Sequence, residues 1–121
     1  MNLYQDEILD HYKHPRNKKR ITDATMSSES SNPLCGDTLG LEIKVENGKI
    51  AEVGFWGEGC AISQASMSMI TDELLGQEAS ALSEFSQKDI LDLLGVSIGP
   101  SRLKCALLPL NIIHKLAIEL H

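Results

Sequence analysis

The chain is short of aromatic residues and contains no long apolar run. Phe, Trp and Tyr make up 4% of its 121 residues, whereas 42% of the residues are hydrophobic. The core must therefore be built from aliphatic side chains, and a chain of this length can bury about two-thirds of its unfolded surface without disulfides. Since no apolar stretch approaches the roughly 20 residues of a membrane span, we expect no membrane-spanning helix.

Positive charge is also scarce, because 11 Lys and Arg residues face 17 Asp and Glu residues and leave a net charge of −6. This balance argues against nucleic acid and against an anionic membrane as partners, since both attract basic proteins. The exception is the basic segment 13–20, whose cations are Lys13, Arg16, Lys18, Lys19 and Arg20. Two interpretations of this segment stay open: a solvated loop, or a docking patch for an acidic partner.

Cysteine is rare as well, with three residues in the whole chain. The first seven residues are acidic and contain no apolar signal core, so we expect a cytoplasmic protein. An odd number of cysteines in a reducing compartment favours thiols or metal ligands over disulfides.

The order of the hydrophobic patterns predicts an α+β fold in a single domain, residues 1–121. Apolar residues at helical spacing predict a first helix over residues 3–13, which Pro15 ends. Strict alternation from Leu39 to Val45 predicts a half-buried strand, and Asn47-Gly48 is a strong signal for a hairpin turn into a returning strand. The serine-rich residues 21–31 are compatible with a loop or with an irregular edge strand.

After residue 60 the apolar period changes from that of a strand to that of a helix. Helices are expected over residues 61–75, 79–85, 87–94 and 102–120. Pro109 must either kink the last of these helices or mark its true first turn. Helices that follow strands in this way favour packing on one face of a small antiparallel sheet.

The first candidate functional residues lie in the segment 32–37, NPLCGD. Pro33 and Gly36 predict an irregular loop tip, on which Cys35 and Asp37 would have exposed side chains. A thiolate and a carboxylate two residues apart on such a bend can bind one metal ion.

The other two cysteines lie in comparable contexts. Cys60 follows the glycine-rich GEG of residues 57–59 and directly precedes a predicted helix, whose positive end favours a thiolate. Cys105 lies near a predicted helix start, with Arg102 and Lys104 close by in sequence. A buried, inert cysteine is the alternative for any one of the three.

Three thiolates and Asp37 make a tetrahedral donor set suited to zinc, or to iron in a cluster. The spacing alone is a weak signal, because the cysteines do not form the close pairs of a zinc finger. Such a zinc site would carry net negative charge, which gives Arg102 and Lys104 an electrostatic supporting role. His11 and His14 are expected to be surface residues near a helix end, while His114 is the rival to Asp37 as fourth ligand.

In its motifs the chain resembles the iron–sulfur cluster assembly scaffolds of the IscU, SufU and NifU amino-terminal family. The resemblance covers nearly the whole chain and rests on ILDHY (8–12), HPRN (14–17), NPLCGD (32–37), GEGCAIS (57–63), AS (65–66) and RLKCA (102–106). It implies a three-stranded antiparallel sheet with helices on one face. It also implies that Cys35, Asp37, Cys60 and Cys105 converge at one exposed end of the molecule.

Within this family the chain departs from IscU at two places. IscU has a histidine where this chain has Lys104, and it carries a chaperone-binding LPPVK motif where residues 96–102 read VSIGPSR. Lys104, Glu58 and the SMSM of residues 66–69 are similar to SufU, which binds zinc and accepts sulfur from a cysteine desulfurase. SufU, however, has a longer insertion between its second and third cysteines.

The resemblance therefore implies an iron–sulfur assembly protein whose partners are a cysteine desulfurase of the SufS or IscS type and downstream assembly or client proteins. Because the extra histidine is missing, we expect a zinc-bound sulfur relay with Cys35 as the sulfur acceptor. The alternative is a scaffold that assembles a transient 2Fe–2S cluster from iron and sulfide. A structural zinc domain is a further alternative, and the lack of a close cysteine pair disfavours a thiol oxidoreductase.

Overall fold

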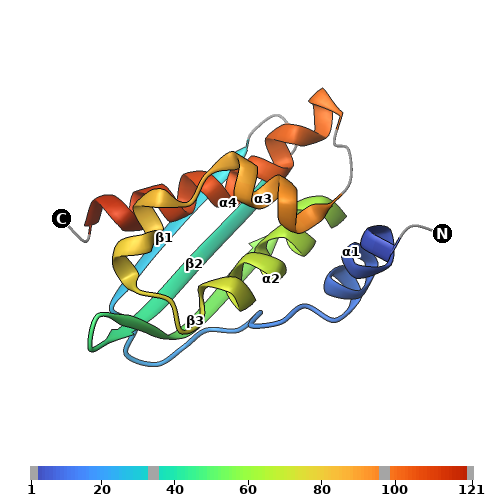
Figure 1. Cartoon of the computed structure of the whole chain (residues 1–121). Helices are drawn as coiled ribbons and strands as arrows, with labels where there is room; N and C mark the ends of the chain where they lie inside the picture. The colour runs from blue at the N-terminus through green and yellow to red at the C-terminus, as the bar shows by residue number, and fades with distance from the viewer. Residues whose placement is uncertain (1–2, 33–35, 96–98, 120–121) are drawn as a thin grey trace.

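The computed structural model describes residues 3–32, 36–95 and 99–119 of the chain (Figure 1). In chain order its elements are α1 (Leu3–Lys13), β1 (Met26–Asn32), β2 (Asp37–Glu46), β3 (Lys49–Glu58), α2 (Ala61–Leu74), the 3₁₀ helix η1 (Ala79–Glu84), α3 (Gln87–Leu94) and α4 (Pro100–Glu119). None of the described helices is long and apolar enough to cross a membrane.

The three strands form one antiparallel sheet in the order β1-β2-β3, as the sequence and the family resemblance predicted. Asn47 and Gly48 both adopt positive φ, of 54° and 77°, and close the β2–β3 hairpin between the paired residues Glu46 and Lys49. This is the geometry for which an Asn-Gly pair is favoured. Of the two alternatives for residues 21–31, the strand is observed in the second half, where β1 pairs with β2 from Met26 onwards.

The helices pack on one face of this sheet, which is the α+β arrangement predicted from the sequence (Figure 1). Alternate residues of β2 point toward them and are fully buried: Leu39, Leu41 and Ile43. Aliphatic and methionine side chains of α2 and α4 complete this core, and Phe55 is its one fully buried aromatic residue among the described side chains. The scarcity of aromatic residues is thus met by an aliphatic core.

The opposite face of the sheet is partly covered by the chain that follows α1, which contacts Gly54 and Glu42. The Glu42 side chain is buried there and accepts hydrogen bonds from the Ile21 amide at 2.6 Å and from Arg20 Nε at 3.2 Å. The Arg20 guanidinium also stacks on Trp56, 3.9 Å from the ring centroid. Two cations of the basic segment 13–20 therefore have structural partners, because Arg16 also pairs with Asp10.

Polar contacts join the end of helix α1 and the segment that follows it to α2, while Ile8 of α1 is buried in the core. Ser68 Oγ lies 2.7 Å from His11 Nδ1 and accepts a 2.8 Å hydrogen bond from the Arg16 amide. The Asn17 side chain donates to Thr71 Oγ1 at 3.0 Å. Burial, and secondarily the charge of Arg16, lowers the pKa of His11 below its usual range. The HPRN motif and His11 thus hold the N-terminal segment in place.

The last helix differs from its predicted bounds at its start, because it begins at Pro100. Pro109 lies inside α4 rather than in its first turn. Without an N–H, Pro109 cannot donate the helical hydrogen bond to the carbonyl four residues earlier, which belongs to Cys105. A proline therefore interrupts the helical ladder at one of the candidate ligands.

Candidate metal centre

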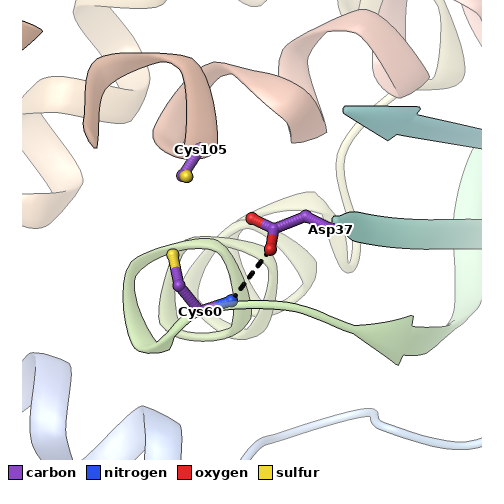
Figure 2. A group of neighbouring side chains, drawn as sticks. All are labelled: Asp37, Cys60 and Cys105. Atoms are coloured by element: carbon purple, nitrogen blue, oxygen red, sulfur yellow. Dashed lines mark hydrogen bonds between the residues drawn. The ribbon is translucent and has the colours of Figure 1, made fainter. Parts of the chain in front are cut away.

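Three of the predicted site residues converge at one end of the sheet. The ligand atoms of Asp37, Cys60 and Cys105 all lie within 4.8 Å of one another. They come from the start of β2, the start of α2 and the second turn of α4, so residues far apart in sequence meet at one point. Figure 2 shows the carboxylate and the two thiols directed toward a common space between these elements.

Asp37 is held in place by the strand and by a backbone amide. It is the first residue of β2, its relative exposure is 3%, and its Oδ1 accepts a 3.1 Å hydrogen bond from the Cys60 amide (Figure 2). The expectation that Asp37 has an exposed side chain on a loop tip is therefore wrong. Pairing of Asn32 with Asp37 across β1 and β2 extends the sheet up to this residue, and the Cys60 loop covers it.

Cys60 is the residue that immediately precedes helix α2, as the sequence predicted. Its loop packs tightly on Asp37: a Cβ at Gly59 would lie 2.9 Å from Asp37 Cγ and 2.4 Å from Ser63 Oγ. Ser63 Oγ in turn donates a 3.0 Å hydrogen bond to the Cys60 carbonyl. The backbone of the half-buried Cys60 is thus held by Asp37 at its amide and by Ser63 at its carbonyl.

Cys105 brings the second thiol from the opposite side. It is 4% exposed and belongs to the sixth position of α4, a little further from the helix start than the sequence suggested. Packing of α4 against α2 and the sheet places its side chain opposite Cys60 (Figure 2). Cys105 is thus buried, as the alternative interpretation of the cysteines proposed. Its thiol nevertheless points toward Asp37 and Cys60 (Figure 2).

The chemistry of these residues fits a bound zinc or iron ion. The second carboxylate oxygen, Asp37 Oδ2, is buried and accepts no hydrogen bond from any described residue. A buried carboxylate oxygen without a partner is costly, and a cation beside it would remove that cost. Ligand atoms of tetrahedral zinc lie about 3.5–3.8 Å apart, as its ~2.0–2.3 Å bonds require, so a separation of at most 4.8 Å needs only a small inward shift.

The remaining predicted site residues are distributed differently. Cys35 lies outside the described residues, as does the side chain of Arg102, while Lys104 is described and exposed. His114 does not join the cluster, because its Nε2 lies 2.7 Å from the Phe85 carbonyl oxygen. His11 contacts Ser68 instead of the cluster. The geometry therefore favours Asp37 over His114 as the metal ligand that accompanies the thiols.

Three residues at the site were not singled out from the sequence. Gly59 and Ser63 make the close contacts described above, and Gln64 in the first turn of α2 is 4% exposed. The motif GEGCAIS contained the first two, but a sequence gives no sign that a glycine is needed for the approach of a carboxylate. Gln64 had no signal other than its position four residues after Cys60.

The sequence model of the protein family described as NifU-like N-terminal domain matches residues 3–119 of this chain. This chain belongs to the NifU-like N-terminal domain family. The sequence resemblance had indicated this family, and the match covers all of the described residues.

Family members with two different names are equally similar to the chain. The zinc-dependent sulfurtransferase SufU of Bacillus subtilis is 35% identical over 130 positions, covering 93% of this chain and 88% of that protein. The iron–sulfur cluster assembly scaffold protein IscU of Streptococcus pyogenes is also 35% identical, over 127 positions that cover 91% of this chain and 79% of that protein. Both alignments are longer than the 121 residues of this chain, so each relative has residues without a counterpart here.

Solved structures of the family have the same fold. The putative iron–sulfur cluster assembly scaffold protein for the SUF system from Fervidobacterium islandicum superimposes with a TM-score of 0.74 at 28% identity, covering 91% of this chain and 93% of that one. The family and fold are therefore established, while the two names among the relatives leave the subtype open.

Proposed function

We propose that this protein is an iron–sulfur cluster assembly protein that accepts persulfide sulfur from a cysteine desulfurase. The observation that supports this most is the convergence of Asp37, Cys60 and Cys105, with a buried carboxylate oxygen that has no partner among the described residues. A relative named as a zinc-dependent sulfurtransferase and one named as an assembly scaffold support the same broad function.

In this proposal Cys35, Asp37, Cys60 and Cys105 hold a zinc ion. Bound zinc supplies positive charge that keeps its thiol ligands deprotonated. The chain contributes the geometry: β2 fixes Asp37, the Cys60 amide orients that carboxylate, and α2 and α4 present the two thiols. Thiolate is a better ligand than carboxylate for zinc, so the bond to Asp37 is the weakest of the four.

We assign the acceptor role to Cys35 because the other two thiols are anchored. Cys105 is 4% exposed within α4, and the backbone of Cys60 is fixed by Asp37 and Ser63. A thiol that meets a persulfide on another protein must reach that protein's surface. Cys35 adjoins the exposed Gly36, whose φ of 71° places it in the left-handed region that favours glycine.

The transfer itself is a thiol–persulfide exchange. The Cys35 thiolate attacks the outer sulfur of the desulfurase persulfide and forms a new sulfur–sulfur bond. The sulfur–sulfur bond of the donor breaks, and the desulfurase cysteine leaves as a thiolate. Cys35 then carries the persulfide, which a downstream assembly or client protein receives in a second exchange of the same kind.

Lys104 supports a zinc-bound relay over a scaffold that builds a 2Fe–2S cluster itself. It occupies the position next to Cys105 where IscU has a histidine, and a lysine must lose a proton before it can bind a metal. The scaffold remains the second candidate, because the relative from Streptococcus pyogenes carries that name at the same 35% identity. In that case iron and sulfide are substrates of the same four residues.

Metal analysis of protein purified without oxygen tests this proposal, together with Asp37→Ala and a control variant, Glu58→Ala. Glu58 is an exposed carboxylate at the end of β3, close in sequence to Cys60. We expect about one equivalent of zinc in the parent and in Glu58→Ala, and weaker or faster-exchanging zinc in Asp37→Ala. Iron with sulfide would favour the scaffold, and parent-like zinc binding by Asp37→Ala would refute the ligand assignment.

A further inference from the structure

Gln64 is a buried polar residue in the first turn of α2 whose contacts the fold alone does not explain. Its side chain is 4% exposed, and its Nε2 donates a 3.4 Å hydrogen bond to the Gly57 carbonyl. Its Oε1 is buried and accepts no hydrogen bond from the described residues. An unsatisfied buried amide oxygen lowers stability, so an apolar side chain of similar length would suit the fold at least as well.

The orientation of this carboxamide follows from its partner. The Gly57 carbonyl can only accept a hydrogen bond, so the NH₂ group of Gln64 must face it and Oε1 must face away. The bond therefore requires a side chain that can donate. Neither a methionine nor a carboxylate at position 64 could donate this hydrogen bond to the Gly57 carbonyl.

Gly57 is the penultimate residue of β3, where it pairs with Leu39 of β2, and it precedes the short connection through Cys60 to α2. One side chain contacts each end of the segment 57–60: Gln64 donates to the Gly57 carbonyl, and Asp37 Oδ1 accepts from the Cys60 amide at 3.1 Å. Between them, Gly59 passes so close to Asp37 that a Cβ would lie 2.9 Å from Asp37 Cγ. Movement of Gly57 would therefore be transmitted to the contact between Cys60 and Asp37.

We propose that Gln64 is a positioning residue for the metal site, which holds the end of β3 at Gly57 so that the Cys60 amide stays bonded to Asp37. The inference rests on the proposed function in one respect, namely that Cys60 and Asp37 are metal ligands. Residues that orient ligands through hydrogen bonds typically change metal affinity about 10- to 100-fold when they are lost. Because Gln64 acts through the backbone, we expect an effect at the lower end, about tenfold.

Gln64→Met tests the proposal, because methionine has a similar length and helix propensity but cannot hydrogen-bond to Gly57. A purely structural role predicts that stability and site geometry change together. A positioning role predicts an unfolding free energy equal to or above that of the parent, with about tenfold faster hydrogen exchange of the Cys60 amide in metal-free protein. Zinc should also dissociate about tenfold faster from the loaded variant.

Gln77→Met is the matched control. The Gln77 carboxamide likewise donates to a backbone carbonyl, that of Glu73 at 2.6 Å, but at the other end of α2. This control should leave the exchange of the Cys60 amide unchanged. If Gln64→Met is unstable, Gln64→Leu provides the same comparison.

Two results would overturn the inference: parent-like exchange of the Cys60 amide in both Gln64 variants, or faster exchange only in proportion to a loss of global stability. A parent protein that binds no metal would refute the proposed function instead. The exchange measurement on metal-free protein would still decide whether Gln64 positions Cys60.

Discussion

Gly59→Ala should displace the Asp37 carboxylate from its present position beside the two thiols. Gly59 does not adopt a positive φ, so the substitution tests the available space rather than the backbone conformation. The new Cβ would lie 2.9 Å from Asp37 Cγ, and carbon atoms pack best at about 3.5–4.0 Å. Asp37 must therefore move by at least about 0.5 Å, more than the ~0.2 Å by which metal–ligand distances usually vary.

We expect this displacement to weaken zinc binding about 10- to 100-fold, measured by competition with a chelator. The same crowding should cost about 1–3 kcal/mol of unfolding free energy, measured by denaturant titration. Gly99→Ala is the control, because no atom of the described residues lies within 4 Å of its added Cβ. It should keep the zinc affinity of the parent.

A double variant separates the two contacts of the added methyl group. The shortest contact of the Cβ, 2.4 Å, is with Ser63 Oγ, which Ser63→Ala removes. Gly59→Ala with Ser63→Ala should therefore recover part of the lost stability but little of the lost zinc affinity, because the clash with Asp37 remains. Zinc affinity equal to that of the parent in Gly59→Ala would refute the reasoning.

Two further predictions concern charge. Lys104 should act as a cation near an anionic site, so Lys104→Arg should retain the metal content of the parent while Lys104→Glu should lower it; equal retention would remove the electrostatic role. His11 has a lowered pKa in the folded protein because it is partly buried, so its contribution to stability is fully present above about pH 6.5 and is lost as the pH falls through the folded-state pKa. Urea unfolding between about pH 7.5 and 5 should show a smaller loss of stability in His11→Gln than in the parent.

The hairpin and the helices of this fold could be predicted from the sequence because their signals are local. Alternation from Leu39 to Val45 and the Asn47-Gly48 pair specify β2 and its turn, and both are observed, although the middle of β2 is buried on both faces and not on one. For β1 the sequence does not distinguish a loop from a strand, because SSESS (27–31) has no apolar face. Its strand conformation comes from backbone pairing with β2, a tertiary contact that a local pattern does not contain.

At the candidate site, too, residues with local sequence signals could be predicted, whereas contacts set by tertiary packing could not. The motifs around Cys60 and Cys105 identified thiols that the structure brings together with Asp37. The burial of Asp37 could not be predicted, because Pro33 and Gly36 indicate a loop but not which residue the sheet reaches first. The contacts of Gly59 and Gln64 depend on how closely β2, β3 and α2 approach, which is set by packing across the whole domain.

The most direct test of the proposed function is to locate sulfur after incubation with a cysteine desulfurase and free cysteine. Intact-mass and peptide mass spectrometry of the zinc-loaded protein would follow the persulfide over time, with Cys35→Ser as the comparison. The account predicts one added sulfur on Cys35 in the parent and no transfer to Cys35→Ser. A persulfide on Cys60 or Cys105, with Cys35 unmodified throughout the time course, would contradict it.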